Sequence, residues 1–333
     1  MAMRIKLPAI VSLISTLALA VAAGPAFPQE TKPLRYGTSI SVLNMPVWVA
    51  RESRLLSKFG QDMEVILIQG GSMITMGILS GELQFSGAGA ESVVAARIKG
   101  GDIELLACPA DSDVVYLITR PEIKSAADLK GKTSAVTRLG SSTHFYLRSA
   151  LRHIGLNPDK DVTILQLGTE FGSGLASGRV ASAALSFDQA FPYIQKGYPV
   201  LLDLTKTDFT YPASCVASSR AFVKGNPERV ENFLKAYTSA IQLIKKDHTA
   251  AERAIVKMLR GMDSEVVKKT VDTYAPLFKA VPKVPDKGLE AVLTELAQRS
   301  PVPKEMMDRL DYYRENGPLD KLVKEGWIDR LYK

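Results

Sequence analysis

Cysteine and histidine are scarce in this 333-residue chain, which has two cysteines and three histidines. Two cysteines are too few for the disulfide framework of a small secreted domain. Cys108 and Cys215 each lie in an apolar, strand-like stretch. The sequence therefore leaves open whether they pair or remain buried thiols. No two histidines stand at the spacing of metal ligands on a helix, so we expect no metal site and no cofactor.

Motifs of common enzyme classes are also absent. The sequence has no Gly-x-Ser-x-Gly elbow and no phosphate-loop lysine. The formal net charge is +7, but the basic residues form no stripe interleaved with aromatic residues and often lie beside acids, as in residues 228–231. We therefore expect no nucleic-acid partner. A modest positive charge is compatible with an anionic ligand or an anionic surface.

Long apolar runs are absent after the first 23 residues. Residues 7–23 carry no charge and follow Arg4 and Lys6, and small residues near position 26 offer a cleavage site. We interpret residues 1–26 as a secretory signal peptide. A membrane span is the alternative, because the run is close to the minimum length for one. The interpretation predicts an exported, soluble mature protein.

The remaining length favours two lobes, because about 300 residues exceed the size at which one core is comfortable. Short strand-like runs alternate with helical periodicity, which indicates parallel sheets covered by helices on both faces. Residues 114–119 are predicted to form a strand, and we place the crossing to the second lobe after it, at Pro121. We place the return at Tyr211 and Pro212. Lobe 1 then comprises residues 31–119 and 212–333, and lobe 2 comprises residues 120–211. The last part is predicted to be helical. A long helix begins at residues 226–227 and has a continuous apolar face from Val230 to Ile244, and further helices are expected at roughly 249–260, 264–278, 286–298 and 303–315.

Small polar loops follow the predicted strands of lobe 1. They contain Ser39 after the first strand, Ser72 after the second, and Ala90 and Glu91 after the third. Ligands of open α/β sheets bind beyond the carboxyl ends of the strands. These loops are candidates for one side of a binding cleft, although glycine and serine are also ordinary turn residues.

Residues 133–155 form the most informative stretch. A β-prone run ends at Thr137, Gly140 permits a sharp turn, and an amphipathic helix follows. Ser141 or Ser142 is expected at the helix N-cap, where free backbone N–H groups and the helix dipole favour an anion. With Thr143, these hydroxyls form a candidate anion cradle. The alternative is that they only cap the helix.

Candidates for acid–base chemistry are few. His144 is the only histidine beside the predicted cleft, and Glu91, Glu170 and Asp188 are the carboxylates near it. No nucleophile or orienting acid accompanies His144 at a recognisable spacing. We therefore expect a protein that is not an enzyme. An aromatic wall of the cleft could come from residues that are otherwise core: Trp48, Phe171, Phe187 or Tyr211.

The ordered motifs resemble the solute-binding proteins of ABC importers. They are residues 77–85 followed by 87–89, then 123–132, then 140–142. The resemblance is to the group that includes the taurine, alkanesulfonate, nitrate and Thi5-like binders, and it spans residues 34 to 258. It implies a type II periplasmic-binding-protein fold. In that fold two lobes, each a mainly parallel sheet flanked by helices, are joined by two crossing strands.

The resemblance also supplies candidate ligand-binding residues. Carried over by position, the family's cleft positions fall on Ser39, Ser72, Ala90 and Glu91 in lobe 1, and on Ser141, Ser142 and the loop 186–188 in lobe 2. Together with Asn44, Thr143 and His144, which the resemblance does not supply, the predicted ligand-binding set is Ser39, Asn44, Ser72, Ala90, Glu91, Ser141, Ser142, Thr143, His144, Phe187 and Asp188. Two departures leave the substrate open. The segment 178–181 has no Asp where the family often has one, and Phe187 stands where a Trp is common. No cysteine cluster like that of the Thi5 enzyme is present.

The expected function follows from the resemblance. It implies a monomeric periplasmic protein that captures a small anionic organic solute, such as a sulfonate or carboxylate, between its lobes. An ABC permease of the inner membrane would be its partner. Two alternatives remain: an exported enzyme that acts on a small metabolite, with His144 or Glu91 as acid or base, and a sensory module that signals to a membrane receptor.

Overall fold

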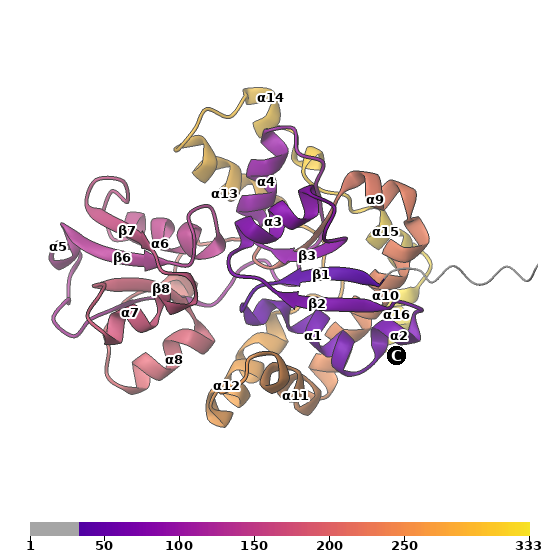
Figure 1. Cartoon of the computed structure of the whole chain (residues 1–333), viewed down its shortest axis with the longest axis horizontal. Helices are drawn as coiled ribbons and strands as arrows, with labels where there is room; N and C mark the ends of the chain where they lie inside the picture. Colours follow the sequence, from indigo (N-terminus) through magenta and orange to yellow (C-terminus); the bar gives the residue numbers. More distant parts are fainter. Residues whose placement is uncertain (1–32) are drawn as a thin grey trace, which may run out of the picture. The chain divides into compact units, whose positions relative to one another are not determined.

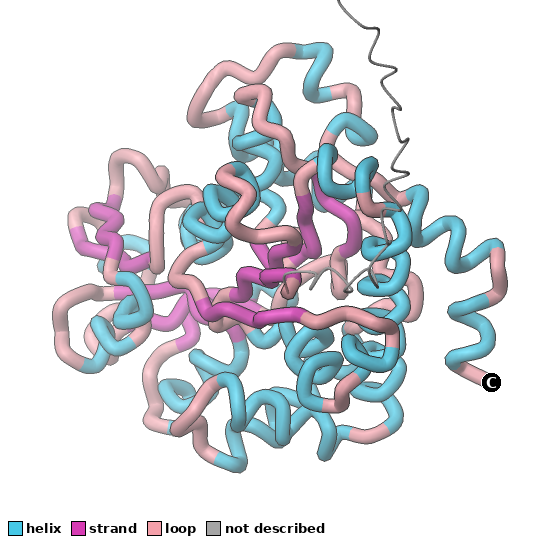
Figure 2. Tube along the Cα trace, turned by 45° about the vertical axis from the view of Figure 1, so that its right-hand side comes forward, coloured by secondary structure: helices cyan, strands magenta, loops and turns pink. Residues whose placement is uncertain are grey.

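The computed structural model describes residues 33–333. The predicted signal peptide, residues 1–26, lies outside the described residues. Within the described part, no helix is both long and apolar enough to span a membrane. Two five-stranded sheets, each flanked by helices, make up the architecture (Figure 1). In Figure 2 the cyan helices lie above and below the magenta strands.

The first sheet has the strand order β2-β1-β3-β10-β4. Its strands are β1 (Leu34–Thr38), β2 (Met63–Leu67), β3 (Phe85–Ala88), β4 (Glu104–Ala107) and β10 (Cys215–Ser218). β1 pairs in parallel with β2 and β3, whereas β10 runs antiparallel to β3 and β4. The sheet is therefore mainly parallel, and its one antiparallel strand comes from a late part of the chain.

Helices cover both faces of the first sheet. α3 (Gly71–Leu79) and α4 (Ala90–Ile98) lie on one face, and α1 (Met45–Glu52), α2 (Leu55–Lys58) and α10 (Pro227–Lys246) lie on the other (Figure 1). α10 packs through Phe233, whose ring stacks on Phe85 of β3 at 4.3 Å between centroids and on Tyr36 of β1 at 5.9 Å. The apolar face of α10 thus forms much of this core.

The second sheet repeats the plan of the first, with the order β7-β6-β8-β5-β9. Its strands are β5 (Val115–Thr119), β6 (Lys132–Val136), β7 (Val162–Gln166), β8 (Ser182–Ser186) and β9 (Val200–Asp203). β5 is the antiparallel strand here. α6 (Ser142–His153) covers one face, and η2 (Gly168–Phe171), α7 (Ser173–Ala176) and α8 (Phe187–Gln195) lie on the other side. Short α5 (Ala126–Leu129) and η3 (Leu204–Lys206) complete this unit.

The predicted boundary at residues 119 and 120 is wrong, because β5 belongs to the second sheet. It pairs with β8 over its whole length, from Val115 opposite Ser186 to Thr119 opposite Ser182. The chain therefore crosses within residues 108–114, before β5, and returns within residues 204–214, before β10. Each crossing leads directly into the antiparallel strand of the sheet that it enters. A buried antiparallel strand has the same apolar pattern as a parallel one, so the sequence did not assign it to a sheet.

A disulfide bond joins Cys108 to Cys215 across the two crossings. Cys108 follows β4 directly, and Cys215 is the first residue of β10. The strand pairing of β4 with β10 brings them together. The sequence left open whether the two cysteines pair or remain buried thiols, and the structure shows that they pair.

The C-terminal region is helical, as its periodicity predicts. It comprises α9 (Arg220–Gly225), α11 (His248–Met258), α12 (Ser264–Tyr274), η4 (Ala275–Leu277), α13 (Asp286–Ala297), α14 (Lys304–Met307), η5 (Leu310–Tyr312), α15 (Gly317–Lys324) and α16 (Trp327–Leu331). The helix predicted at 303–315 is wrong: only α14 and η5 form there, and neither buries a residue. Between Met45 and Lys58 the helix is interrupted and forms α1 and α2, because Arg54 adopts the left-handed conformation, with φ 55°. η1 (Val42–Asn44) precedes it.

Candidate functional site

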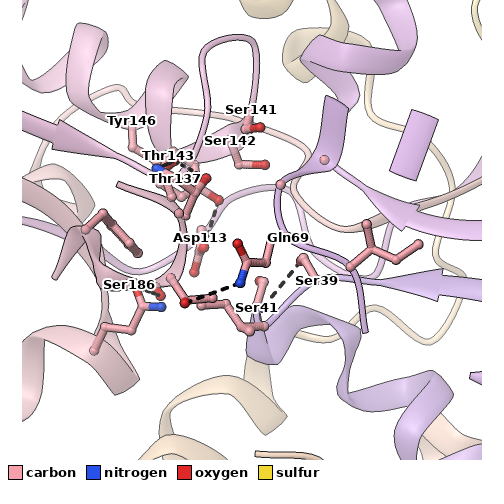
Figure 3. Close-up of a pocket in the computed structure, with 18 residues that line it drawn as sticks. Ser39, Ser41, Gln69, Asp113, Thr137, Ser141, Ser142, Thr143, Tyr146 and Ser186 are labelled. Atoms are coloured by element: carbon pink, nitrogen blue, oxygen red, sulfur yellow. Dashed lines mark hydrogen bonds between the residues drawn. The ribbon is translucent and has the colours of Figure 1, made fainter. Parts of the chain in front are cut away.

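A cavity lies where loops of the two sheets meet (Figure 3). The first sheet contributes residues 39–41 after β1 and 68–71 after β2, and the second contributes residues from the ends of β6, β7 and β8. The cavity has an accessible volume of about 60 Å³. Since one water needs roughly 10–15 Å³ of such volume, the cavity has room for about four to six water-sized groups. Its size suits a small ligand.

Three helix N-caps form part of the cavity wall. They are Gly70 of α3, Ser141 of α6 and Ser186 of α8. The first N–H groups of a helix have no partner inside it and, with the helix dipole, attract negative charge. Among residues 33–333, no Lys, Arg or His lines the cavity. An anion bound here would therefore meet backbone N–H groups and hydroxyls.

The N-terminus of α6 supplies most of the hydroxyls. Thr143 Oγ1 accepts a hydrogen bond from the Thr137 N–H at 3.0 Å, which ties the helix start to the end of β6. Ser142 Oγ accepts from the Tyr211 hydroxyl at 3.1 Å. Ser141 Oγ is buried and has no hydrogen-bond partner within the described part of the chain. Although Ser141 is the N-cap, its side chain makes no capping bond, so its hydroxyl is available to a ligand.

Ser39 provides a hydroxyl from the first sheet to the cavity, and the buried amide of Asn44 holds it in place. Asn44 Nδ2 donates to Ser39 Oγ at 3.2 Å and to Ser214 Oγ at 3.3 Å. Gln69, from the loop after β2, reaches across the cavity and donates from Nε2 to Thr169 Oγ1 at 3.5 Å (Figure 3). The two sides of the cavity are thus in contact.

A carboxylate from the first crossing also lines the cavity. Asp113 is buried, and Oδ2 accepts a hydrogen bond from the Tyr146 hydroxyl at 2.8 Å. Oδ1 accepts from the Tyr274 hydroxyl at 2.6 Å and from the Val114 N–H at 2.8 Å. Burial raises the pKa of Asp113, and the three hydrogen bonds oppose that shift. Tyr146 itself lines the cavity and links Asp113 to α6.

Four of the predicted site residues line the cavity: Ser39, Ser141, Ser142 and Thr143. Asn44 does not, but it positions Ser39. Ser72 and Ala90 do not line the cavity, and both lie at the start of a helix, in α3 and α4. Ser72 is already the second residue of α3, so Gly70 and Gly71 line the cavity in its place. The Ala90 N–H donates to the Pro212 carbonyl at 3.1 Å and is not free for a ligand.

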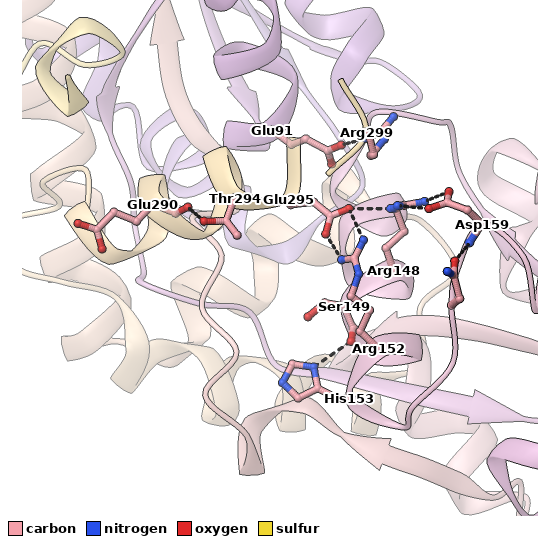
Figure 4. Close-up of polar contacts among 11 residues, drawn as sticks. Glu91, Arg148, Ser149, Arg152, His153, Asp159, Glu290, Thr294, Glu295 and Arg299 are labelled. Carbon is pink, nitrogen blue, oxygen red and sulfur yellow. Dashed lines mark hydrogen bonds and ion pairs between the residues drawn. The ribbon is translucent and has the colours of Figure 1, made fainter. Parts of the chain in front are cut away.

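Glu91 points into a charged cluster outside the cavity (Figure 4), and His144 does not line the cavity either. Glu91 Oε1 accepts from Arg299 Nη1 at 2.6 Å, and burial, opposed by Arg299, raises the Glu91 pKa to about 7. His144 Nδ1 accepts from the Gly140 N–H at 3.1 Å. Burial, followed by the charges of Arg299 and Arg148, lowers the His144 pKa to about 3. Neither group faces the cavity as an acid or base.

Phe187 and Asp188 also lie behind the wall. Phe187 stacks on Phe191 of its own helix, with ring centroids 5.3 Å apart. Asp188 is buried and accepts from the Ser186 hydroxyl at 2.9 Å, and burial raises its pKa to about 7. Ser186 and Gln189 line the cavity instead. The helical turn of α8 rotates the intervening side chains away from the cavity.

Several lining residues were not selected from the sequence. They are Ile40, Ser41, Ile68, Gln69, Asp113, Thr137, Tyr146, Thr169 and Gln189. One signal pointed to Asp113: an acid immediately before the apolar run 114–118. Gln69 and Thr169 follow strands whose ends were predicted, but their sequence carries no mark of a ligand site. Phe171, considered as an aromatic wall, does line the cavity, whereas Trp48 does not.

Comparison with solved structures places the fold. The alkanesulfonate-binding protein SsuA from Xanthomonas axonopodis pv. citri, bound to MOPS, matches with a TM-score of 0.69 and 20% identity, over 82% of this chain and 94% of that one. The periplasmic aliphatic sulphonate-binding protein SsuA from Escherichia coli matches with a TM-score of 0.66 and 20% identity, over 85% and 92% of the two chains. The desulfurization enzyme DSZB matches with a TM-score of 0.65 and 17% identity, over 88% and 99%.

These likenesses establish the two-lobed periplasmic-binding-protein fold that the sequence predicted. No curated protein matches the chain. The model of one family, described as NMT1/THI5 like, matches residues 44–251, which is more than half of the chain. The match includes the whole second sheet, every strand of the first sheet except β1, and all the cavity-lining residues except 39–41. The chain belongs to the NMT1/THI5-like family.

Proposed function

We propose that this chain is an extracytoplasmic solute-binding protein. It captures a small anionic organic solute, such as a sulfonate or carboxylate, in the cavity between its two lobes and delivers it to an ABC permease. The observation that carries the proposal is the convergence of three helix N-caps, Gly70, Ser141 and Ser186, on one small cavity. N–H groups from both lobes would share the negative charge of the solute.

Export and partner are part of the same proposal. A signal peptide at residues 1–26 would take the protein across the membrane, and the sulfonate-binding neighbours are described as periplasmic or as parts of ABC transporters. The boundaries of lobe 1 and lobe 2, corrected for β5, become residues 33–107 with 215–333 and residues 115–203. We further propose that the protein acts as a monomer.

Binding without catalysis is supported by where the acid–base candidates lie. Glu91 pairs with Arg299, and His144 is buried beside the same cluster, so neither faces the cavity. The desulfurization enzyme DSZB has a similar fold, so the fold alone does not decide between a binder and an enzyme. The side chains of this cavity favour a binder, because hydroxyls and amides dominate its polar wall.

Closure of the lobes accounts for how a solute would be held. The two lobes are already in contact at the cavity through Gln69 and Thr169, and Ser142 of the second lobe accepts a hydrogen bond from Tyr211 of the return crossing. A solute that contacts both sides binds the closed arrangement more tightly than an open one and so shifts the population toward closure. The crossings at 108–114 and 204–214 would act as the hinge.

A thermal-shift screen with the purified protein tests the proposal. The panel contains sulfonates, carboxylates, phosphonates and heterocycles, and a bound compound raises the unfolding temperature by mass action. Calorimetry then measures the affinity of the best compound. We expect an organic anion to bind and uncharged heterocycles not to bind.

The Ser141→Ala, Ser142→Ala double variant tests the anion cradle. It should weaken binding of that compound by about 1–3 kcal/mol, because two hydroxyl contacts are lost. The protein should still fold, since the Ser141 side chain makes no capping bond and Ser142 loses only the hydrogen bond from Tyr211, which costs about 1 kcal/mol. Ser57→Ala, an exposed serine on α2, is the matched control. Unchanged affinity in the double variant would rule the cradle out.

A further inference from the structure

Asp113 is a buried acid in the wall of a cavity whose other features favour an anion. Its side chain comes from the first crossing and lies among the lining residues in Figure 3, between Tyr146 and Gln69. Only 4% of the residue is exposed. An anionic solute in this small cavity would lie close to the carboxyl group. Two negative charges in a poorly solvated site repel each other strongly, so one of them has to be neutralised.

The hydrogen-bond partners of Asp113 are all neutral. They are the hydroxyls of Tyr146 and Tyr274 and the backbone N–H of Val114. No ion pair within residues 33–333 involves Asp113, and no cation there acts on its pKa. The protein itself therefore supplies no positive charge that would neutralise this carboxylate when an anion binds.

The ionisable groups near Asp113 in the described part of the chain are acids. Tyr146 comes from α6, Tyr274 from α12 and Tyr211 from the return crossing. Asp188 comes from the start of α8. Burial raises the Asp188 pKa to about 7, and the charge of Asp113 adds to that rise. Each of these neighbours favours the neutral form of Asp113 over the ionised form, or leaves the balance unchanged.

The two oxygens of Asp113 differ in what they can still bind. Oδ1 accepts two hydrogen bonds, from the Tyr274 hydroxyl and the Val114 N–H. Oδ2 accepts one, from the Tyr146 hydroxyl, although a carboxylate oxygen can accept two. A proton would therefore go to Oδ2. A protonated carboxyl oxygen can still accept a hydrogen bond, so the bond from Tyr146 is kept and an O–H donor is gained.

An O–H on Asp113 would match the rest of the cavity wall. Ser141 Oγ is buried, has no partner among residues 33–333, and lines the cavity at the N-cap of α6. The N-caps of α3 and α8, Gly70 and Ser186, also line it. Helix N-termini present N–H donors to an anion. A neutral Asp113 completes a wall of donors from which the one negative charge has been removed.

We propose that Asp113 binds the solute as a neutral acid, with Oδ2–H donating a hydrogen bond to the anionic group. This inference rests on the proposed function and adds to it a specificity-determining residue and a proton. The carboxylate takes one proton from the solvent when the anion binds, so the complex holds the charge of the solute alone. Tyr146 and Tyr274 keep the carboxyl group in position.

Proton uptake makes the affinity depend on pH. The charge of the bound solute raises the pKa of Asp113 in the complex above that in the free protein, because a nearby negative charge disfavours ionisation. Between these two pKa values the complex holds more protons than the free protein, so Kd rises as the pH rises. The rise is at most about tenfold per pH unit for one proton.

Calorimetry with ethanesulfonate and butanoate tests the inference on the wild-type protein. Both probes are ionised between pH 6.0 and pH 8.5, so a pH dependence in this range belongs to the protein. We expect the Kd of the probe that binds to be at least about tenfold higher at pH 8.5 than at pH 6.0. A Kd that is constant or falls with rising pH would overturn the inference, as would failure of both probes to bind at pH 6.0.

A second measurement detects the proton directly. An infrared difference spectrum of the wild-type protein at pH 7, with and without ethanesulfonate or butanoate, should show the carbonyl band of a protonated carboxyl group only with the bound probe. The sulfonate probe has no carbonyl group of its own. Loss of the band in Asp113→Asn would assign it to this residue. Absence of the band from the wild-type complex would overturn the inference.

Asp113→Asn also tests the pH dependence. Asparagine offers a neutral N–H donor and cannot ionise, so the Kd of the variant should change by less than about twofold between pH 6.0 and pH 8.5. Asp111→Asn is the control, since Asp111 lies on the same crossing but is exposed and pairs with Lys279. A folded Asp113→Asn with the pH dependence of wild type would overturn the inference. If Asp113→Asn does not fold, the wild-type affinities and infrared spectrum still decide it.

The outcomes also separate this inference from the proposed function. Anions that bind with the same affinity at every pH, and that weaken in the Ser141→Ala, Ser142→Ala variant, would support the proposed function and overturn the role of Asp113. Failure of the whole panel of anions would overturn both.

Discussion

Asp188 is a buried acid whose ionisation works against folding. Burial raises its pKa from 3.8 to about 7, so the folded protein binds a proton that the unfolded chain releases at lower pH. The folded state then holds more protons between pH 4 and pH 7, and stability falls as the pH rises through this window. Wild type should therefore lose free energy of unfolding from pH 5 to pH 8 because of this group.

Asp188→Asn should remove that loss. Asparagine keeps the size of the side chain and cannot ionise. The difference in free energy of unfolding between variant and wild type should therefore shift in favour of the variant by on the order of 2–4 kcal/mol from pH 5 to pH 8. Urea unfolding at the two pH values measures the difference. His144 has the opposite effect, because its lowered pKa makes stability fall as the pH drops below 6.5, but it is unchanged in the variant. Asp62→Asn, an exposed acid, is the control. The same pH dependence in Asp188→Asn and wild type would contradict the assignment.

The sequence predicted part of the candidate site for a physical reason. Ser39 directly follows β1, and Ser141, Ser142 and Thr143 lie at the start of the helix that follows β6, where strand order alone brings loops to one edge. The sequence could not place Asp113, because it lies on a crossing, and only the fold shows which cavity a crossing passes. Glu91 and Asp188 were misplaced for a different reason. Both sit at the second position of a helix, where the turn directs the side chain away from the cavity.

At the scale of elements, a charged cluster joins α6 to α13. Glu295 of α13 accepts from Arg148 Nε at 2.6 Å and pairs with Arg152, and Arg148 also binds Asp159 (Figure 4). The side chains of Arg148 and Glu295 are only 3% and 5% exposed. α13 also packs on α4 of the first sheet. The cluster therefore ties the cavity helix of the second sheet to a helix on the first.

Glu295→Gln should be strongly destabilising. The substitution keeps the shape but leaves Arg148 buried with a single acid, and removing one partner of a buried ion pair costs about 3–5 kcal/mol. We expect a loss in the upper part of the 1–5 kcal/mol range by urea unfolding at pH 7. Glu290→Gln, one turn earlier and exposed on the same helix, is the control. A loss below 1 kcal/mol in Glu295→Gln would mean that the cluster contributes little to stability.

Elements were predicted best where local pattern and tertiary packing agree. The periodicity of α10 predicted its apolar face, and Phe233 and Tyr237 of that face are buried. The helix predicted at residues 303–315 does not form. The short helices found there, α14 and η5, contain no buried residue. Helical periodicity indicates a helix only when a core is there to receive the apolar face. β5 was recognised as a strand but assigned to the wrong sheet, because its partners are distant in sequence.

At the scale of the whole described chain, a disulfide closes the two crossings at their lobe 1 ends. Cys108 and Cys215 lie 107 positions apart in the sequence and bracket the entire second sheet. The first crossing starts at this bond and the second ends at it, so the second lobe is attached to the first at one covalently closed place. In the closure that we propose, the lobes would move by changes within residues 108–114 and 204–214. Asp113 and Tyr211 lie in these segments, so groups at the cavity would move with the hinge.

Gly89 allows the close contact of the two lobes. It is the N-cap of α4, with an ordinary φ of −68°. A Cβ at this position would lie 2.1 Å from Ser142 Oγ and 2.2 Å from the Tyr211 hydroxyl oxygen. Ser142 belongs to the second lobe and Tyr211 to the return crossing. Alanine is thus compatible with the local backbone and incompatible with this arrangement of the lobes.

Gly89→Ala should therefore weaken solute binding more than it weakens folding. Overpacking of this kind costs about 1–3 kcal/mol, which corresponds to roughly a fivefold to 150-fold rise in Kd. Calorimetry with the best compound of the screen measures the affinity, urea unfolding of the free protein measures stability, and X-ray scattering at saturation measures compaction. Gly225→Ala is the control, since no heavy atom lies within 4 Å of its Cβ position. If Gly89→Ala binds as tightly as wild type and compacts equally, solute capture does not require the contact between α4, α6 and the return crossing.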